Sequence, residues 1–152
     1  MNEMDEKEAH KKYNQILKNV KKIVGGKTTY LGQLDRAAKS IFGNKFYGVY
    51  PADKIPKLND KKTYCILNLD KSTEPGSHWV ALAKIGKNSI IYDSFGRSYT
   101  QIIPELKFSG NGRIYNTDQD TEQPITATDC GARCIAWLKF LDVYGAENAL
   151  KI

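Results

Sequence analysis

Three short apolar runs in the middle of the chain constrain its fold more than any other feature. They span residues 63–69, 78–84 and 89–93, and their length and composition are typical of β-strands. The second and third are joined by IGKN, whose glycine suits a hairpin connection. We therefore expect a mixed or antiparallel sheet that is buried on at least one face.

Helical patterns flank these strands. Residues 5–22 place apolar side chains at i, i+3, i+4 and i+7, and Gly25-Gly26 would end this helix. Further helices are predicted over about 30–42 and from Cys130 to about residue 143. The expected inward-facing residues are Tyr13, Ile16, Leu17, Val20 and Ile23, then Leu31, Leu34, Ala38 and Ile41. The sum is an α+β fold, with a central sheet packed against a C-terminal helix that carries Cys130 and with additional N-terminal helices.

Three segments are less regular. Residues 46–60, FYGVYPADKIPKLND, are aromatic and then turn-rich, which indicates a surface loop with anchored aromatics. Residues 99–108 fit a short helix and a strand equally well. Residues 113–116 could add one more strand.

Length and composition exclude several classes of protein. A chain of 152 residues predicts one compact domain, and we expect a monomer. Its apolar runs are too short to span a bilayer, and its mixed-charge N-terminus lacks the apolar stretch of a secretion signal. We therefore expect an intracellular protein that is not secreted and has no membrane partner.

The net charge of +6 permits non-specific binding of nucleic acid, because phosphate contacts need only mobile cations. The lysines occur in small pairs at 11–12, 21–22 and 61–62. Solvated helix faces and turns are the simpler interpretation of each pair.

The three cysteines are Cys65, Cys130 and Cys134. An odd number does not make a disulfide framework, and no second Cys or His pair follows at zinc-ligand spacing. Cys130 lies in ATDCGARC, where a helix is expected to begin, and a helix N-terminus stabilises a thiolate. Gly131 would leave room for a substrate backbone. A buried structural cysteine is the alternative, and it suits Cys134 better than Cys130.

Three more residues complete a candidate site. His78 opens the strand HWVALAKI and could act as a general base, although a lone loop-edge histidine is usually just exposed. Asp93 ends the next strand, so hairpin pairing would bring its carboxylate to the imidazole; a turn-starting aspartate is the competing interpretation. Gln123, seven residues before Cys130, could donate to an oxyanion, although most surface glutamines have no such role.

His78, Asp93, Gln123 and Cys130, in this order, resemble the adenovirus-type maturation proteases, which belong with the ubiquitin-like (SUMO) deconjugating cysteine proteases. The matching segments are GSHWVAL, IIYDSFG and EQPITATDCGARC, with FYGVY…DKIP as a looser match. The resemblance covers roughly residues 30–143. It implies the roles of base, orienting acid, oxyanion donor and nucleophile, in that order. Trp79 matches an aromatic position near the imidazole, which would place it with Gly131 at the substrate; a core tryptophan is the simpler alternative.

The resemblance also implies a cysteine endopeptidase that cuts viral capsid or core precursors after Gly-Gly or Gly-X sites, in the virion and the infected cell. The seven-residue step from Gln to Cys favours the adenovirus branch. Two features depart from that branch. An Asp stands in place of Glu, and no cysteine lies between Cys65 and Cys130 to hold a disulfide-linked activating peptide. No cofactor is required that the sequence shows, and activation by DNA or by a non-covalent peptide stays open.

The same specificity suggests self-processing. Ile23-Val24-Gly25-Gly26-Lys27 fits the cleavage pattern, so cutting between Gly26 and Lys27 would make residues 1–26 a removable segment and 27–152 the protease domain. A Gly-Gly helix stop explains the same letters equally well.

Three alternatives to the maturation protease stay open. The first is a deconjugating protease that acts on the Gly-Gly tail of ubiquitin-like proteins. The second is a basic nucleic-acid-binding module without catalysis. The third is an acyltransferase that uses the same Cys–His pair.

Overall fold

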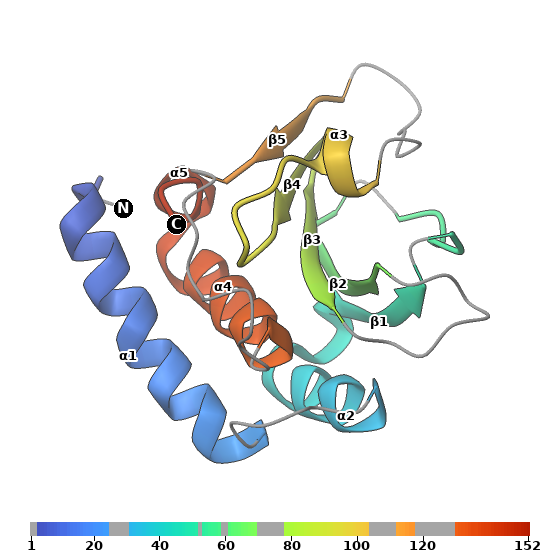
Figure 1. The fold of residues 1–152 in the computed structure, drawn as a ribbon, viewed down its shortest axis with the longest axis horizontal. Coiled ribbons are helices and arrows are strands. Elements are labelled where there is room, and N and C mark those ends of the chain that lie inside the picture. Colours follow the sequence, from blue (N-terminus) through green and yellow to red (C-terminus); the bar gives the residue numbers. More distant parts are fainter. Residues whose placement is uncertain are drawn as a thin grey trace.

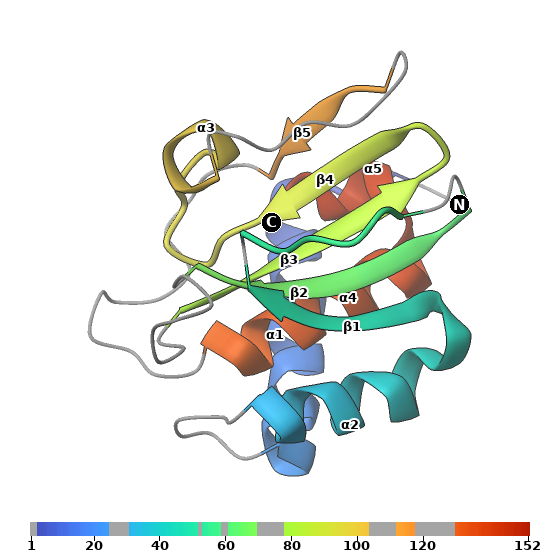
Figure 2. The ribbon, with the colours of Figure 1, turned by 90° about the vertical axis from the view of Figure 1, so that its right-hand side faces the viewer.

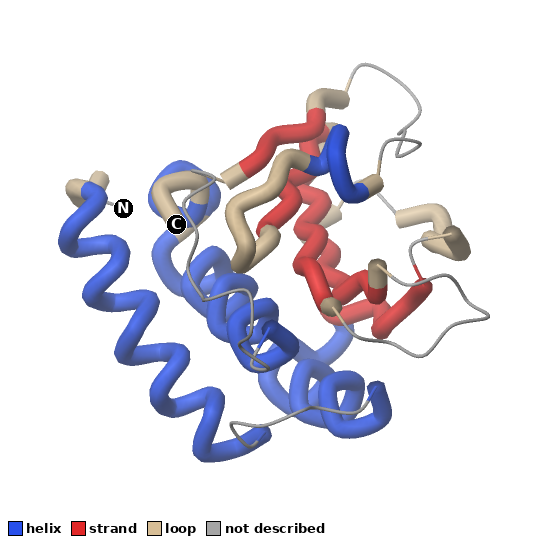
Figure 3. Tube along the Cα trace, in the orientation of Figure 1, coloured by secondary structure: helices blue, strands red, loops and turns tan. Residues whose placement is uncertain are grey.

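A five-stranded mixed sheet with helices packed mainly on one face forms the centre of the computed structural model (Figures 1 and 3). The structure describes residues 3–24, 31–51, 53–58, 61–69, 78–103, 112–117 and 130–152. The elements, in chain order, are α1 (Glu6–Val24), α2 (Leu31–Phe42), the 3-10 turn η1 (Gly43–Lys45), β1 (Phe46–Pro51), β2 (Thr63–Asn68), β3 (Trp79–Ile85), β4 (Asn88–Tyr92), α3 (Tyr99–Ile102), β5 (Ile114–Asn116), α4 (Cys130–Tyr144) and α5 (Ala146–Ala149).

The strands follow one another across the sheet in chain order, β1-β2-β3-β4-β5. The central pairs β2–β3 and β3–β4 are antiparallel, whereas β1 and β5 lie parallel to their neighbours at the two edges. Gly86, with φ of +62°, occupies the tight turn between β3 and β4. The three predicted apolar runs are thereby confirmed as β2, β3 and β4, and the predicted hairpin joins the last two.

Both faces of the sheet are covered, which explains why β2 and β3 are apolar almost without alternation. Every residue of β2 is buried, as are all but the last of β3. One face packs against the helices; the other packs against Leu58 and Ile103. Figure 2 shows α3 and the segment before β2 on the side opposite α4.

Helix α4 is the centre of the packing. It lies between α1 and the sheet in Figure 1, and it also contacts α2. A helix surrounded on so many sides needs apolar residues around its whole circumference. Its buried residues are Cys130, Gly131, Ala132, Cys134, Ile135, Ala136, Trp137, Leu138, Phe140 and Leu141. The predicted C-terminal helix over 130–143 is confirmed, and its sheet-packing role with it.

Helix α1 contributes to the same core as α4. The Asp5 side chain accepts the Glu8 N–H at 2.7 Å, which caps the first turn. Ala9, Tyr13, Leu17 and Val20 are buried. The Tyr13 hydroxyl lies 2.7 Å from the Tyr92 hydroxyl at the end of β4, and the Tyr92 ring stacks on Trp137 of α4. The N-terminal helix is therefore joined directly to the strand that leads into Asp93.

Three expectations need correction or a narrower form. Ile23 was predicted to face inward, but its side chain is 67% exposed, whereas Val24, the next residue of α1, packs against the core. Residues 46–51 form β1 rather than a loop, since they pair with β2. Of the ambiguous stretch, 99–102 is helical and 104–108 lies outside the described residues. The predicted strand at 113–116 is present as β5.

The proposed cleavage site, Gly26–Lys27, lies outside the described residues. Self-processing therefore stays a prediction. Within the parts of the chain that the structure describes, no helix combines the length and apolar character needed to cross a membrane.

The burial of α1 predicts that it is required for stability. Tyr13→Ala should lower the free energy of unfolding by about 3–5 kcal/mol, because it leaves a cavity between α1, β4 and α4. Lys18→Ala, on the exposed side of the same helix, should change it by less than about 0.5 kcal/mol. Urea unfolding measures both. Equal, small effects would mean that α1 is a loosely attached segment.

Candidate functional site

His78 stands at the mouth of the central hairpin, one residue before β3. Its backbone carbonyl accepts the Leu69 N–H at 3.0 Å, which extends the β2–β3 ladder by one more bond and fixes the His78 backbone. Its side chain is 12% exposed. The β3–β4 register, in which Ala81 faces Tyr92, brings the residue after β4 back toward this point.

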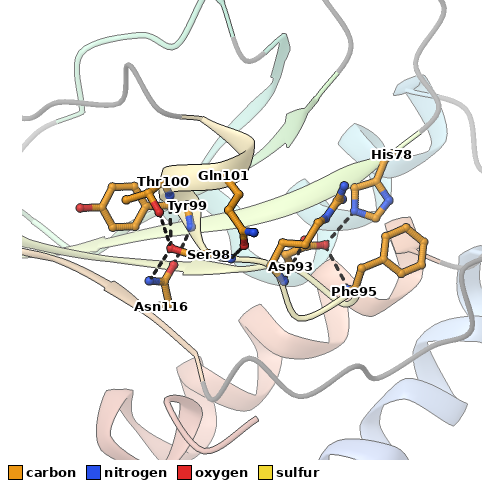
Figure 4. Close-up of polar contacts among 9 residues, drawn as sticks. His78, Asp93, Phe95, Ser98, Tyr99, Thr100, Gln101 and Asn116 are labelled. Carbon is orange, nitrogen blue, oxygen red and sulfur yellow. Dashed lines mark hydrogen bonds and ion pairs between the residues drawn. The ribbon is translucent and has the colours of Figure 1, made fainter.

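That residue is Asp93, whose side chain is fully buried. Its Oδ1 accepts from His78 Nε2 at 2.8 Å and from the Phe95 N–H at 3.1 Å. Its Oδ2 accepts from Arg97 Nε at 2.7 Å and from the Arg97 N–H at 3.3 Å. Figure 4 shows the carboxylate between the imidazole and the turn that follows it. Both interpretations of Asp93 are therefore correct: it starts a turn and it binds the histidine.

The third residue of the candidate site is Cys130, the first residue of α4. Cys130 is 4% exposed. Cys130 is close enough to His78 to help raise the pKa of the imidazole. Because Asp93 occupies Nε2, the ring nitrogen left for the sulfur is Nδ1. The imidazole thus binds a carboxylate and has a thiol near it, and the thiol stands at the positive end of a fifteen-residue helix.

The electrostatics of the pair favour opposite charges on His78 and Asp93. Burial lowers the pKa of His78, but the hydrogen bond to Asp93 and the interaction with Cys130 outweigh it and hold the pKa above the ordinary 6.5. Burial likewise raises the pKa of Asp93, but hydrogen bonds from His78, Arg97 and the Phe95 N–H outweigh it and hold the pKa below 3.8. An ionised carboxylate can only accept, so Nε2 of His78 carries the proton of this bond.

Sequence reasoning missed two residues that touch this pair. The Phe95 ring stacks on the imidazole, with centroids 4.3 Å apart and planes 13° apart. The Arg97 guanidinium lies over the Phe95 ring, 5.3 Å from its centroid. The letters DSFGR did contain a signal, because an aspartate that starts a turn commonly accepts the N–H two residues later.

The structure places the other predicted site residues in different surroundings. Trp79 is 5% exposed and belongs to the core between the sheet and the helices, and the aromatic ring that stacks on the imidazole is that of Phe95. A side chain on Gly131 would meet Leu34 of α2 at 2.9 Å, so this glycine lets two helices approach closely. That contact provides a packing reason for Gly131 in place of the expected room for substrate. Gln123 lies outside the described residues.

The two remaining cysteines are wholly buried. Cys65 lies in β2, where burial raises its pKa to about 12. Cys134 lies one turn after Cys130; burial, and then the nearby Cys130 and Asp93, raise its pKa well above the ordinary value. Both should be protonated at neutral pH.

Comparison with models of known protein families finds no match to this chain, and a search of curated proteins finds no significant relative. The assignment of a function therefore depends on the geometry of the site. Among the described residues, no group of three or more His, Cys, Asp or Glu side chains is placed to hold a metal ion.

The geometry predicts selective alkylation of Cys130. Limiting iodoacetamide, read by peptide mass spectrometry on native protein, should label Cys130 first, because an imidazole is placed to take its proton. Cys65 and Cys134 should label slowly. In His78→Ala the rate at Cys130 should drop while the other two stay unchanged. Equal, slow labelling of all three in the wild type would contradict an activated thiol.

The opposite pKa shifts predict how Asp93→Asn depends on pH. A raised pKa means that charged His78 contributes stability fully below 6.5 and loses it as pH rises through the folded pKa. The lowered pKa of Asp93 means that its contribution is present above 3.8 and is lost as pH falls through the folded pKa. The loss of unfolding free energy in Asp93→Asn should therefore be larger near pH 5.5 than near pH 9, by roughly 1 kcal/mol or more. Chemical denaturation at both pH values measures it, and an equal loss at both would mean that His78 does not charge against Asp93.

Proposed function

We propose that the chain is a cysteine endopeptidase with Cys130 as nucleophile, His78 as general base and Asp93 as the residue that orients the imidazole. One observation carries the proposal. His78 binds the Asp93 carboxylate through Nε2 at 2.8 Å, and it lies close enough to Cys130, at the N-terminus of α4, for that cysteine to help raise the pKa of the imidazole. A nucleophile beside a base that is itself oriented by a third group is the arrangement that covalent catalysis requires.

The reaction follows from these contacts. His78 takes the thiol proton, and the sulfur adds to the carbonyl carbon of the scissile peptide bond. The N–H groups at the start of α4 point toward the negative oxygen that develops, and Gln123 would add a side-chain donor there. The imidazolium then gives its proton to the leaving amine, and water hydrolyses the remaining thioester with His78 again acting as base. Asp93 stays ionised throughout and stabilises the charged ring.

The substrate class comes from the resemblance of the sequence motifs to adenovirus-type maturation proteases. On that basis the substrates are viral capsid or core precursors with Gly-Gly or Gly-X at the cleavage site, cut in the virion or the infected cell. Glycines suit a narrow approach to a cysteine residue that is only 4% exposed, because a chain without side chains needs the least space. A deconjugating protease shares the same catalytic groups and differs in needing a folded ubiquitin-like partner.

Turnover of a quenched Ile-X-Gly-Gly-X peptide tests the proposal. Cys130→Ala should abolish cleavage and keep the fold, because alanine is well tolerated at a helix start. Cys134→Ala makes the same change one turn later on the same helix and should retain catalysis. Gln123→Ala should reduce kcat by about 10²–10³ if its amide stabilises the oxyanion.

The outcomes separate the candidate functions. Cleavage of the peptide that depends on Cys130 supports the endopeptidase. Cleavage confined to a ubiquitin-like fusion would identify a deconjugase instead. Peptide cleavage that survives Cys130→Ala would exclude this site as its source, and a wild-type rate in Gln123→Ala would remove Gln123 from the mechanism.

A further inference from the structure

Arg97 makes contacts that the proposed reaction does not yet use. It lies in the turn between β4 and α3, and two of its donors reach one oxygen of Asp93: Nε at 2.7 Å and the backbone N–H at 3.3 Å from Oδ2. His78 binds the other oxygen, Oδ1. The two partners therefore hold the carboxylate from opposite sides and fix its rotation about the bond to Cβ.

A second contact connects Arg97 to the histidine through Phe95. The Phe95 ring lies flat against the imidazole, and the guanidinium lies over the Phe95 ring, with centroid distances of 4.3 and 5.3 Å. Arg97 thus reaches His78 by two routes, one through Asp93 and one through the aromatic ring. Neither route needs a contact between Arg97 and a substrate.

The turn that carries Phe95 and Arg97 is anchored at both ends. At its start, the Gly96 N–H donates to the Asp93 carbonyl at 2.8 Å, and Gly96 has φ of +74°. At its end, the Asn116 side chain of β5 accepts the Tyr99 N–H at 2.7 Å and donates to the Ser98 hydroxyl at 3.2 Å, as Figure 4 shows. The backbone that carries the Arg97 side chain is consequently fixed.

We propose that Arg97 is a positioning residue of this protease, which turns Oδ1 of Asp93 toward His78 and holds the Phe95 ring against the imidazole. The inference rests on the proposed function, because it concerns the same Cys130–His78 pair. Arg97 acts through its neighbours, and it is not a catalytic residue.

The positive charge of Arg97 acts on Asp93 rather than directly on His78. A cation beside an imidazolium would, by repulsion, disfavour the charged ring, so a direct electrostatic benefit to His78 does not account for it. Its hydrogen bond instead helps to hold the pKa of Asp93 low. The guanidinium binds Asp93 through Nε and lies over the Phe95 ring, while its Nη2 is buried without a hydrogen-bond partner in the described part of the chain.

The proton NMR signal of the His78 Nε2–H provides a readout that does not depend on catalysis. A hydrogen bond to a buried carboxylate shifts this signal downfield and slows its exchange. The signal should be present in the wild type, absent in Asp93→Asn and lost or broadened in Arg97→Ala. Arg113→Ala removes an exposed arginine just before β5 and should leave the signal unchanged.

The kcat values of the Arg97 variants should follow the same order as their NMR signals. Arg97→Ala should lower kcat on the Gly-Gly peptide by on the order of 10² while KM changes less than about twofold, because only the geometry of the base is disturbed. Arg97→Lys keeps the charge and loses the planar contact, so its kcat and its NMR signal should be intermediate. Circular dichroism would establish that each variant is folded.

Each outcome decides one question. A wild-type NMR signal in folded Arg97→Ala overturns the positioning role, whether or not the protein cleaves peptides. If Arg97→Ala does not fold, wild-type signal and kcat in Arg97→Lys overturn it instead. If the wild-type protein cleaves no peptide and its three cysteines are alkylated equally slowly, the proposed protease is overturned. Loss of the NMR signal in Arg97→Ala would then still support the positioning contacts.

Discussion

The site depends on a carboxylate that the fold removes from water and keeps charged. An ion in the interior loses several kcal/mol of hydration, and it stays ionised only when other groups replace the lost water. Asp93 is fully buried, and its two oxygens accept four hydrogen bonds, from His78, Phe95 and Arg97. Three of these bonds come from the turn that Asp93 itself starts. Most of the hydration is therefore replaced locally, which leaves one lone-pair direction for the imidazole that comes from the neighbouring strand.

The other two members of the site are placed by long-range packing. The β3–β4 register brings Asp93, just after β4, toward His78, just before β3, and a slip of one residue would turn every side chain of one strand to the opposite face. Cys130 is placed by α4, which is clamped between α1, α2 and the sheet. The close approach of Gly131 to Leu34 sets how near the start of this helix comes to α2. The chemistry thus depends on a hairpin register and on a helix position, and both are stabilised by burial far from the sulfur.

The sequence was sufficient where a pattern had a local cause. Strand-like runs, a helix start at Cys130 and a short hairpin connection brought His78 and Asp93 together as expected. It was insufficient where tertiary contacts decide. The β1 segment has the aromatic and turn-forming residues of a loop, and it becomes a strand because β2 offers an edge to pair with. Gly131 was interpreted as space for a substrate because the sequence does not show that Leu34 packs against it. Phe95 was overlooked because stacking depends on where the side chain points, and the residue type alone does not show this.

The three cysteines show how strongly position governs the chemistry of one side chain. Cys65 lies in the middle of an apolar strand, where nothing stabilises a negative sulfur and burial raises its pKa to about 12. Cys134 shares a helix with Cys130, yet it lies four residues, or about 6 Å, further from the helix start. Cys134 is therefore away from the free N–H groups of the first turn and inside the apolar core, where burial raises the pKa of its thiol. Among the described cysteines, Cys130 is the one that stands at a helix N-terminus and close enough to His78 to help raise the pKa of the imidazole. A reactive thiol in this chain is accordingly a property of the first turn of α4 and of the hairpin mouth that faces it.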